Sequence, residues 1–279
     1  MKKFLSVLMA AAMLLSVCAL TACGGNEEPA PETEGTEVTE PAEEGTLTTV
    51  TEGVLTMSTN AAFPPYEMTN DAGEYEGIDV EIAQAIADKL GLELKIDDMD
   101  FDAALMAAQN GKSDMVMAGV TVNEERLAVM DFSDSYATGV QVIIVTEDSA
   151  ITSVDDLFAE GASNVIGVQR NTTGDLYTTW DLEDAGLATI DRYSKGADAV
   201  QALKTGKVDC VVIDNEPAKA FVAEVEGLEI LETEYVLEDY VGAMSKDNTA
   251  LYEAVNAALQ ELIADGTVKS IIDTYISAQ

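Results

Sequence analysis

The chain has 279 residues and a formal net charge of −38, and its length is enough for two lobes of about 100 residues each. It contains no histidine, which excludes Ser-His-Asp and Cys-His hydrolases and every His-based zinc site. The balance of 52 Asp and Glu against 14 Lys and Arg argues against nucleic-acid binding, and the 47% of hydrophobic residues support a sizeable core.

A targeting segment opens the chain. Lys2 and Lys3 precede an apolar run over residues 4–20, which is too short for a membrane span. The run ends in Leu-Thr-Ala-Cys at residues 20–23, which resembles the lipobox of bacterial lipoprotein signal peptides. The resemblance implies that residues 1–22 are cleaved and that Cys23 carries a diacylglyceryl group, whose two acyl chains would anchor the protein stably. An ordinary secretory signal with a chance cysteine is the alternative.

An acidic segment follows the signal. Residues 24–45 contain eight Glu, three Pro and no basic residue, so we predict that residues 23–46 form a lipidated, disordered tether. Cys210 lies in an apolar run over residues 208–213 and is predicted to be a buried core thiol. If Cys23 is lipidated, no intramolecular disulfide can form.

Predicted strands and helices alternate from residue 47 onward. We predict strands over residues 53–59, 92–96, 114–118, 140–145, 165–168, 189–192 and 208–213. We predict helices over residues 79–90, 102–110, 175–184, 197–205, 248–264 and 267–277. This alternation predicts an α/β fold with parallel or mixed sheets and helices on both faces.

Two segments share one pattern at the same spacing. Residues 103–116 and 198–211 both indicate a helix, a Gly-Lys-x-Asp turn and a buried strand. Any unit of helix and strand with a glycine cap would give this pattern; the other interpretation is two lobes built on one plan. In this alignment Gly119 matches Asp214, and both follow a strand, where open α/β sheets bind ligands. Two such ends facing each other would form a cleft.

Several stretches together resemble one known family. They are residues 58–67, 77–83, 118–126, 131–136, 167–174 and 212–217. The resemblance, which runs from about Val54 to the C-terminus, is to the periplasmic-type solute-binding proteins of polar amino-acid ABC importers. It implies the type II periplasmic-binding-protein-like fold, with two α/β lobes joined by two crossing hinge strands. Lobe one would comprise residues 47–139 and 241–279, and lobe two residues 140–240, with a ligand enclosed by Venus-flytrap closure.

The resemblance assigns a carboxylate-binding role to Arg126. An α-amino acid is a zwitterion, and a closed site must pair both of its charges. A guanidinium pairs both oxygens of a carboxylate, and the family pattern places Arg126 there with the help of Thr121. The alternative is a surface ion pair of Arg126 with Glu124 or Asp131, which would stabilise the protein little.

The second lobe is expected to supply the other charged contacts. Thr172 and Thr173 open a predicted helix, whose backbone N–H groups favour an anion; plain helix capping is the alternative. Asp214 is expected to pair with the ligand ammonium, with the carbonyl of Gly119 as a second acceptor. The alternative for Asp214 is a turn residue.

The side-chain pocket is assigned from the same resemblance. Phe63 and Phe101 match aromatic walls, although each alone would be a core residue. Asn60 and Gln169 are the expected polar specificity contacts. Asn60 stands where members that bind cationic amino acids often have Asp, so we expect a neutral polar ligand such as glutamine; Glu67 at the pocket edge leaves a cationic ligand open.

These expectations describe a binding protein without catalysis, cofactor or metal. We expect a monomeric receptor, lipid-anchored at the extracytoplasmic face of the cell membrane, that delivers a polar amino acid to the transmembrane subunits of an ABC permease. The fold alone does not exclude an enzyme resembling cyclohexadienyl dehydratase, with Glu67 as the general acid or base. A receptor that presents its ligand to a sensor protein is a further alternative.

Overall fold

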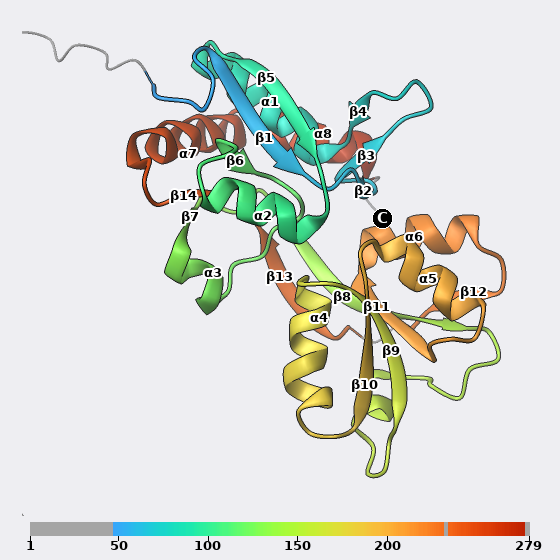
Figure 1. The fold of residues 1–279 in the computed structure, drawn as a ribbon. Helices are drawn as coiled ribbons and strands as arrows, with labels where there is room; N and C mark the ends of the chain where they lie inside the picture. Colours follow the sequence, from blue (N-terminus) through green and yellow to red (C-terminus); the bar gives the residue numbers. More distant parts are fainter. Residues whose placement is uncertain (1–46, 232–233, 277–279) are drawn as a thin grey trace, which may run out of the picture. The chain divides into compact units, whose positions relative to one another are not determined.

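The computed structural model describes residues 47–231 and 234–276 (Figure 1). The predicted signal peptide, the predicted lipidation site Cys23 and the predicted acidic tether lie outside these residues. Within the described part of the chain, no helix has both the length and the apolar character needed to cross a bilayer.

The first sheet has five strands in the order β5–β1–β6–β14–β7. β1 pairs in parallel with β5 and β6, whereas β14 pairs antiparallel with β6 and β7. The strands are β1 (Val54–Thr59), β5 (Glu93–Asp98), β6 (Met115–Val116), β7 (Met130–Phe132) and β14 (Ala243–Ser245). The last five residues of β1 are all buried, as expected for a strand that is covered on both faces.

Helices cover both faces of this sheet (Figure 1). The face that carries Leu55, Met57 and Met115 packs in one core with α1, α7 and α8, while Val116 packs with α2 in another. The helices are α1 (Ile78–Leu90), α2 (Phe101–Gln109), α3 (Glu124–Val129), α7 (Thr249–Ala264) and α8 (Thr267–Tyr275). A small antiparallel sheet of β2 (Ala62–Phe63), β3 (Glu67–Thr69) and β4 (Tyr75–Glu76) precedes α1.

The second sheet has the strand order β10–β9–β11–β8–β12, and β13 also pairs with β8. β9, β10 and β11 are parallel, and β8 is antiparallel to β11, β12 and β13. The strands are β8 (Ala137–Thr146), β9 (Asn164–Gln169), β10 (Ala188–Tyr193), β11 (Cys210–Asp214), β12 (Leu228–Ile230) and β13 (Val236–Tyr240). The helical segments are η1 (Val154–Phe158), α4 (Thr173–Thr178), η2 (Thr179–Glu183), α5 (Gly196–Lys204) and α6 (Asn215–Glu224).

The chain crosses between the two sheets twice. It passes from β7 of the first sheet to β8 of the second, and it returns from β13 to β14. β8 and β13 lie side by side with Tyr240 opposite Ala137. This confirms the predicted α/β fold with two crossing strands. The residue boundaries of the two lobes stay a prediction.

The repeated pattern has the same geometry in both sheets. Gly111 and Gly206 have φ values of 64° and 71°, a left-handed conformation that ends each helix without the cost a Cβ would bring. After each turn an aspartate accepts a backbone N–H from the neighbouring strand: Asp114 from Thr56 at 2.7 Å and Asp209 from Val165 at 2.7 Å. The Gly-Lys-x-Asp motif therefore fixes the register of a buried strand at two places.

Two sequence-based expectations need correction. Asp214, for which a turn residue was the alternative, ends β11 and is the N-cap of α6, and Pro217 is tolerated in the first turn of that helix because its missing N–H would have no partner. The helix predicted over residues 175–184 is a short α-helix, α4, followed by the π-helical turn η2. Strands β2, β3, β4, β7, β12, β13 and β14 were not predicted. Cys210 is a free, fully buried thiol as predicted, and burial raises its pKa to about 12.

Candidate functional site

One cavity gathers eight of the ten predicted ligand-binding residues. They come from both sheets and stand at strand ends or at the beginning of a helix, where side chains converge in open α/β folds. The cavity is lined by Asn60, Phe63, Glu67, Phe101, Ala118, Gly119, Gln169, Thr172, Thr173 and Asp214. Its volume is about 20 Å³, which is room for about one water-sized molecule. An amino acid can therefore enter only if the lining residues move apart.

Polar contacts hold the two sides of this cavity together. The side-chain amide of Gln169 donates to Oδ1 of Asn60 at 2.9 Å, and Nδ2 of Asn60 donates to the carbonyl of Met99 at 2.8 Å. The two residues predicted to select the ligand side chain thus bind each other.

Arg126 and Thr121 do not line this cavity. Nη1 of Arg126 donates to the carbonyl of Thr121 and Nη2 to that of Asn171, both at 2.7 Å, and the guanidinium lies 5.4 Å from the ring centre of Phe101. Arg126 is buried, and burial lowers its pKa to about 10 although nearby Glu238 opposes this shift.

The alternative interpretation of Arg126 as a surface ion pair is wrong. Its side chain is buried, and the ion pairs found among the described residues do not include it. The guanidinium is instead held by two backbone carbonyls. The sequence predicted its importance but not these partners.

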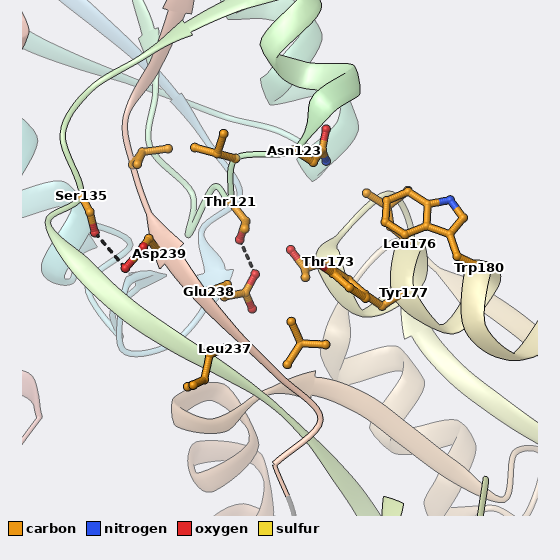
Figure 2. Close-up of a pocket in the computed structure, with 13 residues that line it drawn as sticks. Thr121, Asn123, Ser135, Thr173, Leu176, Tyr177, Trp180, Leu237, Glu238 and Asp239 are labelled. Atoms are coloured by element: carbon orange, nitrogen blue, oxygen red, sulfur yellow. Dashed lines mark hydrogen bonds between the residues drawn. The ribbon is translucent and has the colours of Figure 1, made fainter. Parts of the chain in front are cut away.

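Thr121 lines a second, larger cavity, which is drawn in Figure 2. This cavity has a volume of about 350 Å³ and lies between β13 and the helical segment α4–η2. The hydroxyl of Thr121 donates to Glu238, and Thr173 lines both cavities. Tyr177 and Trp180 form its aromatic wall, with their rings in a T-shaped contact at 5.4 Å.

Buried carboxyl groups surround the smaller cavity. Glu67 is 1% exposed, and its carboxyl group lies beside that of Asp79, close enough for the two to interact through a hydrogen bond. Burial, followed by the charge of Asp79, raises the pKa of Glu67 well above its ordinary value. Asp79 is also fully buried; burial raises its pKa to about 6, although its Oδ2 accepts the backbone N–H of Gly119 at 2.9 Å.

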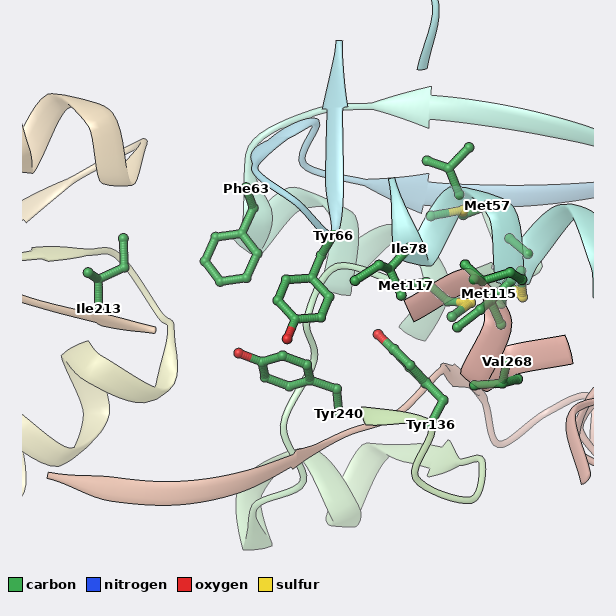
Figure 3. Close-up of a cluster of buried hydrophobic side chains, with 14 of the residues drawn as sticks. Met57, Phe63, Tyr66, Ile78, Met115, Met117, Tyr136, Ile213, Tyr240 and Val268 are labelled. Atoms are coloured by element: carbon green, nitrogen blue, oxygen red, sulfur yellow. The ribbon is translucent and has the colours of Figure 1, made fainter. Parts of the chain in front are cut away.

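Asp214 is the carboxyl group at the end of β11. It is 6% exposed and accepts a hydrogen bond from the hydroxyl of Tyr240. Burial and then the charge of Glu238 raise its pKa well above the ordinary range. The ring centres of Tyr66 and Tyr240 lie 4.9 Å apart and the two rings are nearly perpendicular. Figure 3 draws both side chains. The carboxyl group predicted to bind an ammonium is thus buried in an environment that disfavours its charge.

Sequence reasoning missed three polar residues around Asp214: Gln141, Glu238 and Tyr240. They lie on the two crossing strands, and no family stretch quoted above includes them. Glu238 and Tyr240 belong to the short alternating pattern of β13, which has only five residues. Among the described residues, no three His, Cys, Asp or Glu side chains are arranged to hold a metal ion.

The fold and the cavity define a two-lobe ligand-binding protein. Comparison with known families matches residues 55–278 to the bacterial extracellular solute-binding proteins, family 3. The protein belongs to this family.

Individual relatives extend this comparison. The chain is 29% identical to an arginine-binding extracellular protein of Bacillus subtilis over 100% of both chains. It is 29% identical to a probable histidine-binding protein of Neisseria gonorrhoeae, over 100% of this chain and 97% of that protein. Among solved structures, an ancestral arginine-binding protein bound to arginine is similar, with a TM-score of 0.75 and 37% identity over 81% of this chain and 99% of that chain. An ancestral amino-acid-binding protein described as a precursor of cyclohexadienyl dehydratase has a TM-score of 0.71 and 29% identity, over 80% and 95% of the two chains.

Proposed function

We propose that this protein is a lipid-anchored receptor at the extracytoplasmic face of the cell membrane, which binds a polar L-amino acid between two lobes and delivers it to an ABC permease. In this proposal lobe one comprises residues 47–139 and 241–279, and lobe two residues 140–240. The observation that carries the proposal is the cavity lined from both sheets by eight of the predicted residues. The arginine- and histidine-binding relatives support the ligand class.

The proposed contacts pair both charges of the amino acid. Asp214, which lines the cavity, would accept the ammonium. Arg126 would bind the carboxylate, but this requires its guanidinium to exchange a backbone carbonyl for the ligand. Separation of the lobes would free it, because the carbonyl of Asn171 belongs to the proposed lobe two and Arg126 to lobe one.

The buried carboxyl of Glu67 at the wall of the cavity favours a cationic side chain. Its raised pKa favours the protonated form in the empty cavity, and a guanidinium or ammonium would stabilise the carboxylate by its charge and its hydrogen bonds. Asn60 by itself favours a neutral polar side chain such as that of glutamine. We propose that arginine or lysine is preferred and that glutamine binds more weakly, because an amide forms no ion pair with Glu67.

A thermal-shift screen of the twenty amino acids tests this proposal. Arginine and lysine should raise the melting temperature most, since a ligand at a thousand-fold excess over its dissociation constant stabilises by about 4 kcal/mol. Aspartate and glutamate serve as matched negative controls, because their side-chain carboxylates would meet Glu67. A screen in which no amino acid shifts the melting temperature would contradict the proposed function.

A catalytic alternative rests on Glu67 and on the similarity to the dehydratase precursor. A buried carboxyl with a raised pKa resembles a general acid. Incubation with prephenate or arogenate separates the two functions, because turnover would release CO₂. We expect none, and measurable turnover abolished by Glu67→Gln would favour the enzyme.

A further inference from the structure

Asp214 and Glu238 stand on the same face of the second sheet, on either side of β8. Asp214 lies opposite Gln141, and Glu238 lies opposite Gly139. Directly opposed residues of antiparallel strands point to one face, and so do residues two apart on one strand. Both carboxyl groups therefore share that face with the side chain of Gln141.

The strand between them brings the two carboxyl groups into one hydrogen-bonded network. Gly139 has no side chain, so the ring of Tyr240 passes over β8 and its hydroxyl donates to Asp214. Glu238 accepts from the side-chain amide of Gln141 and from the hydroxyl of Thr121. The crossing strand β13 is thus bonded both to the proposed ammonium-binding carboxyl and to the segment that precedes Arg126.

Negative charge exceeds positive charge in this network. Asp214 is 6% exposed and Glu238 is 7% exposed. Asp214 is faced by Glu238 and Tyr240 from β13, and its charge also acts on Glu67 and Tyr66. Arg126 is a cation that interacts with the charge of Glu238, but its Nη atoms donate to backbone carbonyls.

Two like charges in a buried site do not both ionise readily. Burial and then the charge of Glu238 raise the pKa of Asp214, against the hydrogen bonds from Tyr240 and Gln141. An arriving ammonium would reverse this balance, since an opposite charge favours the carboxylate.

We propose that Glu238 is a positioning residue of the ligand site: it holds a proton on Asp214 while the cavity is empty, and the ammonium of the ligand displaces that proton. The inference rests on the proposed role of Asp214. In the step, the O–H bond of the Asp214 carboxyl breaks, the carboxylate accepts an N–H of the ligand, and the proton passes to the buffer. Glu238 lines the larger cavity of Figure 2, whereas Asp214 lines the smaller one.

Calorimetric titration with L-arginine and with L-glutamine tests this step. Titrations between about pH 5 and pH 8, in buffers of different ionisation enthalpy, measure the protons released per ligand bound. In the wild type we expect release approaching one proton at the acidic end, so that affinity rises up to ten-fold per pH unit and then levels off. Glutamine must also release a proton. Its neutral side chain does not draw a proton from Glu67, so release with glutamine points to Asp214.

Glu238→Gln keeps the shape of the side chain and removes its charge. We expect the rise in affinity to move to lower pH, with proton release at the acidic end reduced at least two-fold. Asp239→Asn is the matched control, because it removes the same charge one residue along β13 from an exposed side chain. Its profile should coincide with that of the wild type.

The outcomes separate this inference from the proposed function. Binding of either amino acid without proton release in the wild type would overturn the inference alone, whatever the variants do. A pH dependence of affinity that Glu238→Gln does not shift, or that Asp239→Asn shifts equally, would also overturn it. If Glu67→Gln shifts the pH dependence instead, the proton belongs to Glu67. If no amino acid binds at all, the proposed function fails and this inference fails with it.

Discussion

Replacing Gly139 by alanine tests the close approach that lets Tyr240 reach Asp214. Gly139 is buried on β8, and a Cβ at this position would lie 2.5 Å from Cζ and 2.8 Å from Cε1 of Tyr240. Tyr240 is fully buried, and its ring packs edge-on against Tyr66. The ring cannot shift without disturbing this packing, so we expect its hydroxyl to leave Asp214.

The cost follows from the contacts that are lost. A buried carboxyl without its donor costs about 1–3 kcal/mol, and an extra methyl group in a packed core costs about 1–3 kcal/mol. The free energy of unfolding of Gly139→Ala should therefore fall by roughly 2–6 kcal/mol, measured by urea unfolding at constant m-value.

A double-mutant cycle with Tyr240→Leu provides the control. Leucine lacks the ring atoms that the new Cβ would meet, so Gly139→Ala in this background should cost less than about 1 kcal/mol. An equal cost in both backgrounds would refute the reasoning, because the clash with Tyr240 would then not be the cause. So would a cost below about 1 kcal/mol in the wild type.

The remaining predictions concern binding, stability and anchoring. Arg126→Lys should weaken amino-acid binding by roughly 2–5 kcal/mol, since an ammonium cannot reproduce the guanidinium fork; unchanged calorimetric affinity would remove Arg126 from the site. Asn60→Asp should weaken glutamine binding and strengthen arginine or lysine binding, and no change in either would remove Asn60 from the pocket. The pKa of Asp79 is about 6 in the folded protein against 3.8 ordinarily. The stability that the protonated side chain contributes is therefore lost as pH rises through about 6, and acidification from about pH 7.5 to about pH 5 should raise the unfolding free energy by about 1 kcal/mol. A decrease of the unfolding free energy on acidification would contradict this. Cys23→Ser should release the protein from membranes with ligand affinity intact, and retention after a salt wash would speak against lipidation.

The elements that the sequence predicts well are those with a strong local pattern. β1, α1 and α5 begin and end within two residues of their predicted bounds, because buried runs and glycine stops define them locally. β13 and β14 could not be found in this way. Each is at most five residues long, and each pairs with strands far away in the sequence.

For the candidate site, too, local motifs were predicted and long-range contacts were not. Family motifs predicted which residues gather at the strand ends, such as Asn60 and Asp214. They did not predict that Asn60 bonds to Gln169, or that Arg126 donates to two carbonyls, because these contacts depend on how the sheets are placed. The network of Glu238 and Gln141 depends on strand register, which a single short strand does not encode.

Trp180 gives this protein a built-in optical probe. It is the single tryptophan of the sequence, and it stands in η2 at the wall of the larger cavity, 44% exposed and in contact with Tyr177. Because it does not line the smaller cavity, an amino acid bound there would not quench its emission by direct contact. A change in the emission maximum, or in quenching by acrylamide, would therefore report a rearrangement near β13. Stopped-flow fluorescence of the unlabelled protein could follow that rearrangement in time, on a single residue and without a background from other indoles.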